Sequence, residues 1–252
     1  MMKCLIMSEI NLRNFSEGTM ITTLAQVKLE KKISDSLFLI SISLERYKEW
    51  IPGMFMQISL DVRSGSNYWL DSKAFSFASW GSPEARILVR REGSFTQELI
   101  SRSEVGFLTS VRYPFGDFLL NSDSDKVFIA GGTGISVFLS YLDYITLSRK
   151  DDHNTLIFNS NKTAEENLSK VYDKEVPKGV SVKQFITDPK SDRYTGRMNV
   201  DIIRREVLEM KSKEFYVCGP PHFNMYWGEK LRELGLKFKV EQWINLSGDK
   251  VQ

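Results

Sequence analysis

The chain has 252 residues, of which 34 are basic and 32 acidic, giving a formal net charge of +2. It is 42% hydrophobic and 26% charged, which is ordinary for a globular protein and excludes fibrous, collagen-like and disordered classes. The near-zero net charge gives no electrostatic reason to expect a nucleic-acid partner. The two cysteines, Cys4 and Cys218, are too few for a disulfide framework or a four-cysteine iron–sulfur cluster, and we expect no metal site.

The beginning of the chain shows no targeting signal. Residues 1–18 lack the long apolar core and small-residue cleavage site of a signal peptide. No apolar run approaches the roughly 18 residues of a membrane span, so we expect no membrane segment. We expect residues 1–18 to be either a loose N-terminal extension or an over-long start of a cytoplasmic protein.

Short alternating runs in the first half predict β-strands. Apolar residues recur at every second position in 36–44 and 54–60, as in strands that bury one face. Turn signals such as Pro52-Gly53 separate these runs. Several strands at this spacing indicate an antiparallel barrel or sandwich. The predicted strands are 36–44, 54–60, 74–79, 86–90 and 109–113, and a strand-like pattern also begins just after Met20.

The pattern changes near the polar cluster Asn121–Asp125, after which strands alternate with helices. This alternation predicts a parallel sheet with helices on both faces. We therefore predict one domain at 19–121 and an α/β domain at 122–252. Strands are expected at 126–130, 155–159, 180–186, 214–218 and 237–242, and helices from Ile135, from about Thr163 and over Phe223–Leu234.

A glycine-rich turn lies between the first predicted strand of the second half and its helix. Its sequence is Gly131-Gly132-Thr133-Gly134-Ile135. Glycines let the backbone approach a phosphate closely, and a helix N-terminus offers free amides and a positive dipole end. No Gly-Lys-Ser/Thr follows, and Val137 stands where a dinucleotide fingerprint has its third glycine. Taken alone, the turn is either a phosphate loop or an ordinary tight strand–helix connection.

A second motif, Cys218-Gly219-Pro220-Pro221, ends another predicted parallel strand. That edge of an open α/β sheet is where ligands bind. The alternative is a buried cysteine followed by a proline pair that starts a helix.

The first half contributes two further motifs. Lys73-Ala74-Phe75-Ser76-Phe77-Ala78-Ser79 alternates a cation, flat rings and hydroxyls along one strand. It suits phosphate binding and ring stacking, or it is an ordinary edge strand. Gly93-Ser94-Phe95-Thr96 predicts a turn that opens a short helix. Its amides suit a pyrophosphate, or it is an ordinary capped helix.

Taken together and in this order, the four motifs resemble those of the ferredoxin–NADP reductase superfamily of flavin- and pyridine-nucleotide-dependent oxidoreductases. The segment Tyr113-Pro114-Phe115-Gly116-Asp117-Phe118 between them fits the same pattern. The resemblance covers about residues 20 to 245. It implies that 19–121 is an antiparallel six-stranded β-barrel that binds FAD, with FMN as an alternative. It also implies that 122–252 is a parallel-sheet domain that binds NADPH or NADH.

The resemblance assigns flavin contacts to the two motifs of the first half. Phe75 would stack on the flavin ring, and the Ser76 hydroxyl would bond near its N5 atom. Lys73 replaces the family's usual arginine, which keeps the charge on the flavin phosphate but loses the bidentate fork. The remaining cofactor-binding candidates of this half are Ala74, Gly93, Ser94, Phe95 and Thr96.

The resemblance also assigns the nicotinamide nucleotide's contacts. Gly131, Gly132, Thr133 and Gly134 would hold its pyrophosphate, and Cys218, Gly219 and Pro220 would place the nicotinamide beside the flavin. Lys162 and Arg197 either meet a 2′-phosphate or are solvated surface charges, so NADP and NAD both remain open.

Two residues near the last strand complete the predicted site. Glu241 would pass a proton and Trp243 would lie near the flavin ring, or both belong to an ordinary strand end. The predicted catalytic residues are therefore Ser76, Cys218 and Glu241. Cys218 would shape the nicotinamide site and would not act as a nucleophile.

The implied reaction is hydride transfer from NAD(P)H to the flavin, followed by release of electrons. The resemblance implies a separate acceptor: a ferredoxin, a flavodoxin, a haem protein or an oxygenase component. One alternative is an electron-transfer subunit without independent turnover. Another is a nucleotide-binding module whose family sites have decayed.

Overall fold

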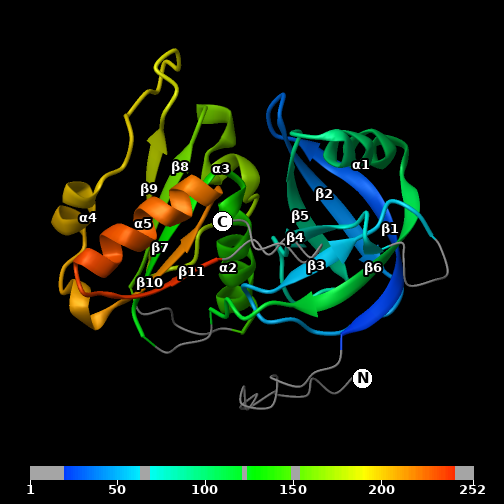
Figure 1. Cartoon of the computed structure of the whole chain (residues 1–252), viewed down its shortest axis with the longest axis horizontal. Coiled ribbons are helices and arrows are strands. Elements are labelled where there is room, and N and C mark those ends of the chain that lie inside the picture. Colours follow the sequence, from blue (N-terminus) through cyan, green and yellow to red (C-terminus); the bar gives the residue numbers. More distant parts are fainter. Residues whose placement is uncertain (1–19, 63–68, 121–123, 149–153, 242–252) are drawn as a thin grey trace.

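The computed structural model describes residues 20–62, 69–120, 124–148 and 154–241. These residues form two β-sheets that lie side by side, each with its own helices (Figure 1). The expected extension at 1–18 and Trp243 lie outside the described residues.

The first sheet is antiparallel and has the strand order β4-β3-β6-β1-β2-β5. Its two end strands approach each other, and the amide of Ala78 after β4 donates to the carbonyl of Arg86 in β5 at 2.7 Å. The sheet is therefore a nearly closed six-stranded barrel, which confirms the predicted fold of this half. Its strands are β1 (Ile21–Lys32), β2 (Leu37–Leu44), β3 (Phe55–Ile58), β4 (Lys73–Ser76), β5 (Glu84–Arg90) and β6 (Phe107–Phe115).

The barrel interior follows from the alternation of side chains along its strands. In β2, Phe38, Ile40 and Ile42 point into the barrel, where they are fully buried. Helix α1 (Ser94–Val105) packs Leu99 and Ile100 onto the same core. A strand places successive side chains on opposite faces, so the residues between them face out of the barrel.

The second sheet is parallel, in the order β11-β10-β7-β8-β9, and helices cover both faces (Figure 1). One face packs with α2 and α3, and the other with α4 and α5. This confirms the predicted parallel-sheet half. Its elements are β7 (Lys126–Gly131), α2 (Ser136–Ser148), β8 (Thr155–Asn161), α3 (Leu168–Val171), β9 (Val180–Ile186), α4 (Val200–Glu206), β10 (Glu214–Cys218), α5 (Pro221–Glu233) and β11 (Lys237–Val240), with 3-10 turns at Gly132–Ile135, Ala164–Glu166 and Met210–Ser212.

Several predicted elements differ in extent. The helix expected from about Thr163 is two short turns, because Asn167 takes an extended backbone conformation that ends one turn and caps the next. The strand expected at 74–79 ends at Ser76, and the last strand ends at Val240. Helix α4 was not predicted from the sequence, although Asn199 caps its start by accepting from the Ile202 amide at 3.0 Å.

One apolar core joins the two halves. Leu37, Leu39 and Leu88 point out of the barrel and are buried against α2 and β7 of the parallel sheet. Trp80, which follows β4, meets Tyr144 of α2 edge to face, with 4.9 Å between ring centroids. The barrel's outward residues and the helix therefore bury each other's apolar surface, which fixes the halves against one another.

Among the residues that the structure describes, no helix is both long and apolar enough to cross a membrane.

Leu39→Ala should lower the free energy of unfolding by about 2–5 kcal/mol, because it leaves a cavity in the core that both halves share. Chemical denaturation would measure this loss. Leu208→Ala is the matched control, because Leu208 is 77% exposed and its truncation should change the stability by less than about 0.5 kcal/mol. Equal effects of the two substitutions would contradict the prediction.

Candidate functional site

Two predicted motifs meet at the carboxyl edge of the parallel sheet. Strands β7 and β10 are neighbours, with Ala130 paired to Cys218, so the turns that follow them lie side by side. A Cβ atom on Gly134 would lie 2.0 Å from the carbonyl oxygen of Cys218. Only glycine allows this approach, so the backbones of the two turns are in direct contact.

Phe223 of α5 lies against both glycine turns and was missed by the sequence analysis. A Cβ atom on Gly219 would be 2.6 Å from its ring, and one on Gly131 would be 3.1 Å away. The ring explains why both turns carry glycine. The sequence signal was the presence of Gly131 and Gly219, because such glycines indicate that another group approaches the backbone closely but do not identify that group.

Cys218 is fully buried, and burial, followed by the nearby charge of Glu241, raises the pKa of its thiol well above the ordinary value. The thiol is therefore neutral and a poor nucleophile. This fits the predicted role of Cys218 in shaping the site, which stays a prediction.

Glu241 directly follows β11 and lies beside Cys218. Its amide donates to the carbonyl of Val217 at 2.9 Å, and its own carbonyl accepts from the Asn224 side chain at 2.7 Å. Burial, followed by the charge of Asp117, raises the pKa of the Glu241 carboxyl to about 8. Near neutral pH this buried group carries a proton that it can hold or release.

The strand motif of the first half places its side chains in graded exposure. Lys73 is exposed, Phe75 is half-buried and Ser76 is buried. The Ser76 hydroxyl has no hydrogen-bond partner among the described residues. Because a buried polar atom is normally paired, this hydroxyl is suited to a ligand that supplies the partner.

The two motifs of the first half lie together. Phe75 and Phe95 stack with 6.2 Å between ring centroids. Gly93 caps α1, and the Thr96 hydroxyl accepts from the amides of Glu92 and Gly93 at 3.1 Å each. Thr96 thus fixes the turn, and the helix start presents the amides of its first turn and the positive end of its dipole.

Arg90 is a second residue that the sequence analysis missed. It ends β5, and its guanidinium forms a two-pronged ion pair with Glu166 of the second half, at 3.0 and 2.8 Å. Burial favours the neutral acid, but Arg90 and the hydroxyls of Ser34 and Ser36 outweigh it and lower the pKa of Glu166.

The same guanidinium is 3.7 Å from where a Cβ atom on Gly132 would lie. A fixed cation therefore stands beside the glycine turn. The sequence signal was Arg90-Arg91 immediately before the Glu92-Gly93 turn.

The remaining predicted residues differ in exposure. Gly131 is buried, Thr133 is half-buried and Pro220 is exposed. Lys162, directly after β8, and Arg197, between β9 and α4, are both exposed. The structure thus brings residues 131–134, 218–219 and 241 into one cluster and residues 73–76 and 93–96 into another.

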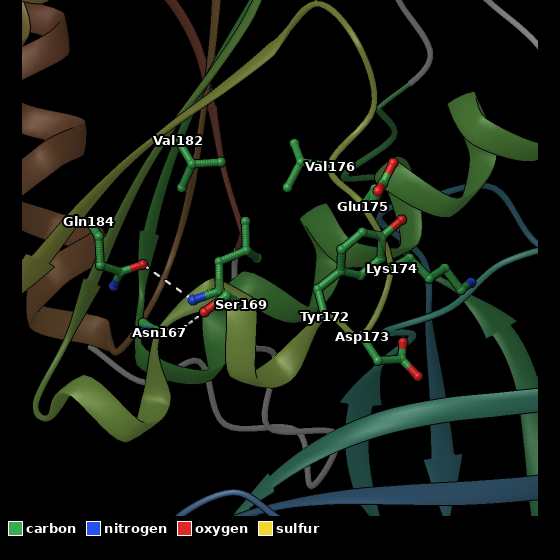
Figure 2. Close-up of a pocket in the computed structure, with 10 residues that line it drawn as sticks. Asn167, Ser169, Tyr172, Asp173, Lys174, Glu175, Val176, Val182 and Gln184 are labelled. Atoms are coloured by element: carbon green, nitrogen blue, oxygen red, sulfur yellow. Dashed lines mark hydrogen bonds between the residues drawn. The ribbon is translucent and has the colours of Figure 1, made fainter.

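A hollow of about 520 Å³ lies elsewhere, between α3 and the edge strand β9 (Figure 2). None of the predicted site residues lines it. Its lining residues are Asn167, Leu168, Ser169, Tyr172, Asp173, Lys174, Glu175, Val176, Val182 and Gln184.

Comparisons with known proteins agree with this architecture. Residues 128–227 match the family model of the oxidoreductase NAD-binding domain. A flavohemoprotein of Bacillus anthracis is 26% identical over 231 residues, which cover 82% of this chain and 57% of that protein. The anthranilate 1,2-dioxygenase electron transfer component of Acinetobacter baylyi is 26% identical over 210 residues, covering 79% and 59%. The chain thus spans somewhat more than half the length of these relatives.

A solved structure shows the same fold. The ferredoxin NADP+ reductase from Neisseria gonorrhoeae, with bound FAD and NADP, superposes with a TM-score of 0.71 at 16% identity, covering 87% of this chain and 98% of that one. A barrel followed by a parallel-sheet NAD-binding domain defines a class of two-domain oxidoreductase folds. The chain has this two-domain fold, and its residues 128–227 resemble the oxidoreductase NAD-binding domain.

The raised pKa of Glu241 predicts a pH dependence of stability. The folded state binds the proton up to about pH 8, whereas the unfolded group releases it near 4.5. Folded molecules therefore hold more protons between these values, and the free energy of unfolding falls as the pH rises through that window, by up to about 1.4 kcal/mol per pH unit.

Denaturation of the purified chain at pH 5 and pH 8 measures this slope. Glu241→Gln removes the titrating group and should flatten the slope. A slope that Glu241→Gln leaves unchanged would assign it to other groups.

Proposed function

We propose that the chain is a flavoprotein reductase that takes a hydride from NADPH or NADH onto FAD bound at the barrel and passes the electrons to a separate redox acceptor. The observation that carries this proposal is the buried, unpaired hydroxyl of Ser76 on the same strand as the half-buried ring of Phe75. The domain boundaries near residue 122 and the assigned site residues are part of the proposal.

The residues of the barrel fit a flavin. Phe75 offers a ring face for stacking. Ser76 offers a hydrogen bond to a ring nitrogen, and the start of α1 at Ser94 suits phosphate groups. Lys73 is exposed and adds a positive charge. FMN would use the same ring contacts, so the strand motif alone favours FAD and FMN equally.

The residues of the parallel sheet fit a nicotinamide nucleotide. The glycine turn 131–134 offers backbone amides at the start of α2 that suit a pyrophosphate, and the Arg90 guanidinium, paired with Glu166, lies beside Gly132. The backbone at Cys218-Gly219, against which the Phe223 ring packs, lies at the carboxyl edge of the sheet, where we expect the nicotinamide ring to bind.

When bound, the flavin supplies the ability to accept a hydride and to release electrons singly or in pairs. The chain's own residues would orient the two cofactor rings and exclude water from between them. Ser76 would donate or accept a hydrogen bond at the flavin's reacting nitrogen, and Glu241 holds a proton near neutral pH. The shared core between the halves keeps the ring platforms aligned, which lowers the barrier by positioning.

The partner is proposed from relatives. One relative is named as an electron transfer component of a dioxygenase and another as a flavohemoprotein. Both names are consistent with an oxygenase component or a haem group as acceptor. A cytoplasmic location remains a proposal based on the low cysteine content.

The dioxygenase relative also favours a second candidate function. A component of that kind would bind flavin yet reduce no soluble acceptor until its partner subunit is added. Turnover of dyes or cytochrome by the purified chain alone separates the two functions, because only an independent reductase shows it.

The central test identifies the flavin that the purified chain binds and then titrates the complex anaerobically with each nicotinamide. The proposal expects bound FAD, bleached by NADPH or NADH. Ser76→Ala should retain FAD but slow its reduction roughly 10- to 100-fold, because one hydrogen bond to the reacting nitrogen is lost. A chain that binds neither FAD nor FMN after reconstitution would end the proposal.

Nucleotide preference is testable at the two exposed cations. If Lys162 and Arg197 meet a 2′-phosphate, then Lys162→Ala and Arg197→Ala should each raise the KM for NADPH about 5- to 20-fold and leave the KM for NADH unchanged. Lys211→Ala is the matched control, because Lys211 is exposed and lies before the amino end of β10, at the opposite edge of the sheet. Parallel changes for both nucleotides, or none, would remove these residues from the specificity site.

A further inference from the structure

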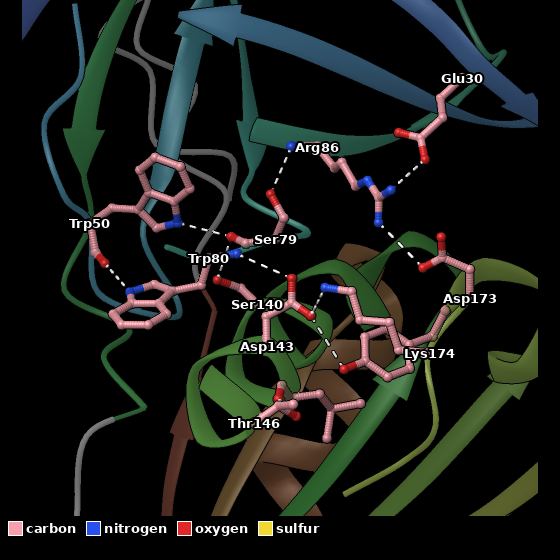
Figure 3. A network of polar contacts seen from close by, with 12 residues as sticks. Glu30, Trp50, Ser79, Trp80, Arg86, Ser140, Asp143, Thr146, Asp173 and Lys174 are labelled. Atoms are coloured by element: carbon pink, nitrogen blue, oxygen red, sulfur yellow. Dashed lines mark hydrogen bonds and ion pairs between the residues drawn. The ribbon is translucent and has the colours of Figure 1, made fainter. Parts of the chain in front are cut away.

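The chain that leaves strand β4 is tied directly to helix α2. Just after Ser76, the carbonyl of Ser79 accepts from the hydroxyl of Ser140 at 2.9 Å, and the amide of Trp80 donates to Oδ2 of Asp143 at 3.4 Å (Figure 3). Two side chains of α2, one turn apart, therefore hold the exit of the proposed flavin strand.

The barrel side of this junction is rigid. The Trp50 indole nitrogen donates to the same Ser79 carbonyl at 2.9 Å, and the Trp50 backbone carbonyl accepts from the Trp80 indole nitrogen at 2.7 Å. The Trp50 ring also stacks on Phe77 with 4.0 Å between centroids. These contacts hold the exit of β4 in place within the barrel. A shift of helix α2 would therefore change the position of α2 relative to strand β4.

Helix α2 carries the other end of the connection. It begins at Ser136, immediately after the glycine turn 132–135, and Asp143 lies about two turns later, roughly 10 Å along the axis. Only this short helix separates the proposed nucleotide turn from the residues that hold the flavin strand.

Asp143 is itself fixed by the second half. It is buried, and its Oδ1 accepts from Lys174 Nζ at 2.6 Å and from the Tyr172 hydroxyl at 3.2 Å. Burial, followed by the charge of Asp143, raises the pKa of Tyr172, so this hydroxyl stays protonated and donates. Lys174 and Tyr172 also line the hollow beside α3 (Figure 2), which leaves the Lys174 side chain 43% exposed.

We propose that Asp143, assisted by Ser140, is a positioning residue that sets the distance between the flavin strand and the nucleotide turn. The inference rests on the proposed function. Asp143 lies outside both clusters of proposed cofactor-binding residues and would act through Trp80. Hydride transfer requires two rings in van der Waals contact, and its rate falls steeply with sub-ångström misplacement.

The test compares Asp143→Ala with Asp173→Asn in the FAD-bound protein. Asp173 is the matched control, because it pairs with Arg86 at the same junction, at 3.3 Å, but does not contact the exit of β4. Anaerobic stopped-flow with saturating NADPH or NADH gives the limiting rate of flavin reduction, the nucleotide Kd and the long-wavelength charge-transfer absorbance of stacked rings.

Asp143→Ala should lower the limiting rate about tenfold and weaken the charge-transfer absorbance, with FAD retained and the nucleotide Kd within twofold. Asp143→Asn keeps an oxygen for the Trp80 amide and should recover part of the rate. Ser140→Ala removes a single hydrogen bond and should slow reduction in the same direction, which keeps the test available if Asp143→Ala does not fold. The proposal would be overturned if Ser140→Ala and Asp143→Ala both left the limiting rate unchanged. It would also be overturned if Asp173→Asn slowed flavin reduction as much as Asp143→Ala does.

Amide hydrogen exchange supplies a readout that needs no turnover. Asp143→Ala should speed exchange at the Trp80 amide at least tenfold over Asp173→Asn, while β1 and β2 keep their protection. If neither nicotinamide reduces the unaltered protein, the proposed function fails and this exchange result alone decides the positioning role. Unchanged exchange at Trp80 would overturn it.

Discussion

The structure depends on one apolar core that belongs to both sheets. The barrel is lined inside by one set of strand residues, and its outward leucines, among them Leu37, Leu39 and Leu88, are buried by α2 and β7. Neither half can cover these side chains alone. The hydrophobic free energy of this shared surface therefore fixes the mutual orientation of the halves. The polar contacts across the junction add to an orientation of the two halves that the burial of apolar surface already favours.

Polar contacts join the two halves at two separate places along the junction. Arg90 and Glu166 join the halves beside the glycine turn, and Asp143 joins them beside the exit of β4. Both carboxylates are buried and both are paired, which is required because an unpaired buried charge is strongly destabilising. Each pair lies next to one of the two proposed cofactor sites. The polar contacts that orient the two halves therefore lie close to the residues that would hold the reacting rings.

Much of the fold followed from the sequence because its signals are local. Period-two alternation predicted β2 and β3, and strand–helix alternation predicted the parallel sheet. The helix expected from about Thr163 is divided into two short turns, because a single extended residue, Asn167, interrupts it. The predicted glycine turns were found in contact, but Phe223 and Arg90 were missed. Their positions depend on which strands become neighbours, and that information is held in the tertiary packing and not in any one segment.

The contact between Gly134 and Cys218 has a consequence for how the site can vary. At residue 134 the contact requires the absence of a side chain, whereas residue 218 takes part only through its backbone carbonyl oxygen. Position 134 is therefore closed to substitution for steric reasons, while this contact leaves position 218 free to take other side chains. Position 218 is restricted by a different constraint, because its side chain is fully buried in the core that the two halves share. Variation of the proposed nucleotide surface must therefore keep glycine at 134 and, at 218, a side chain that fits this core.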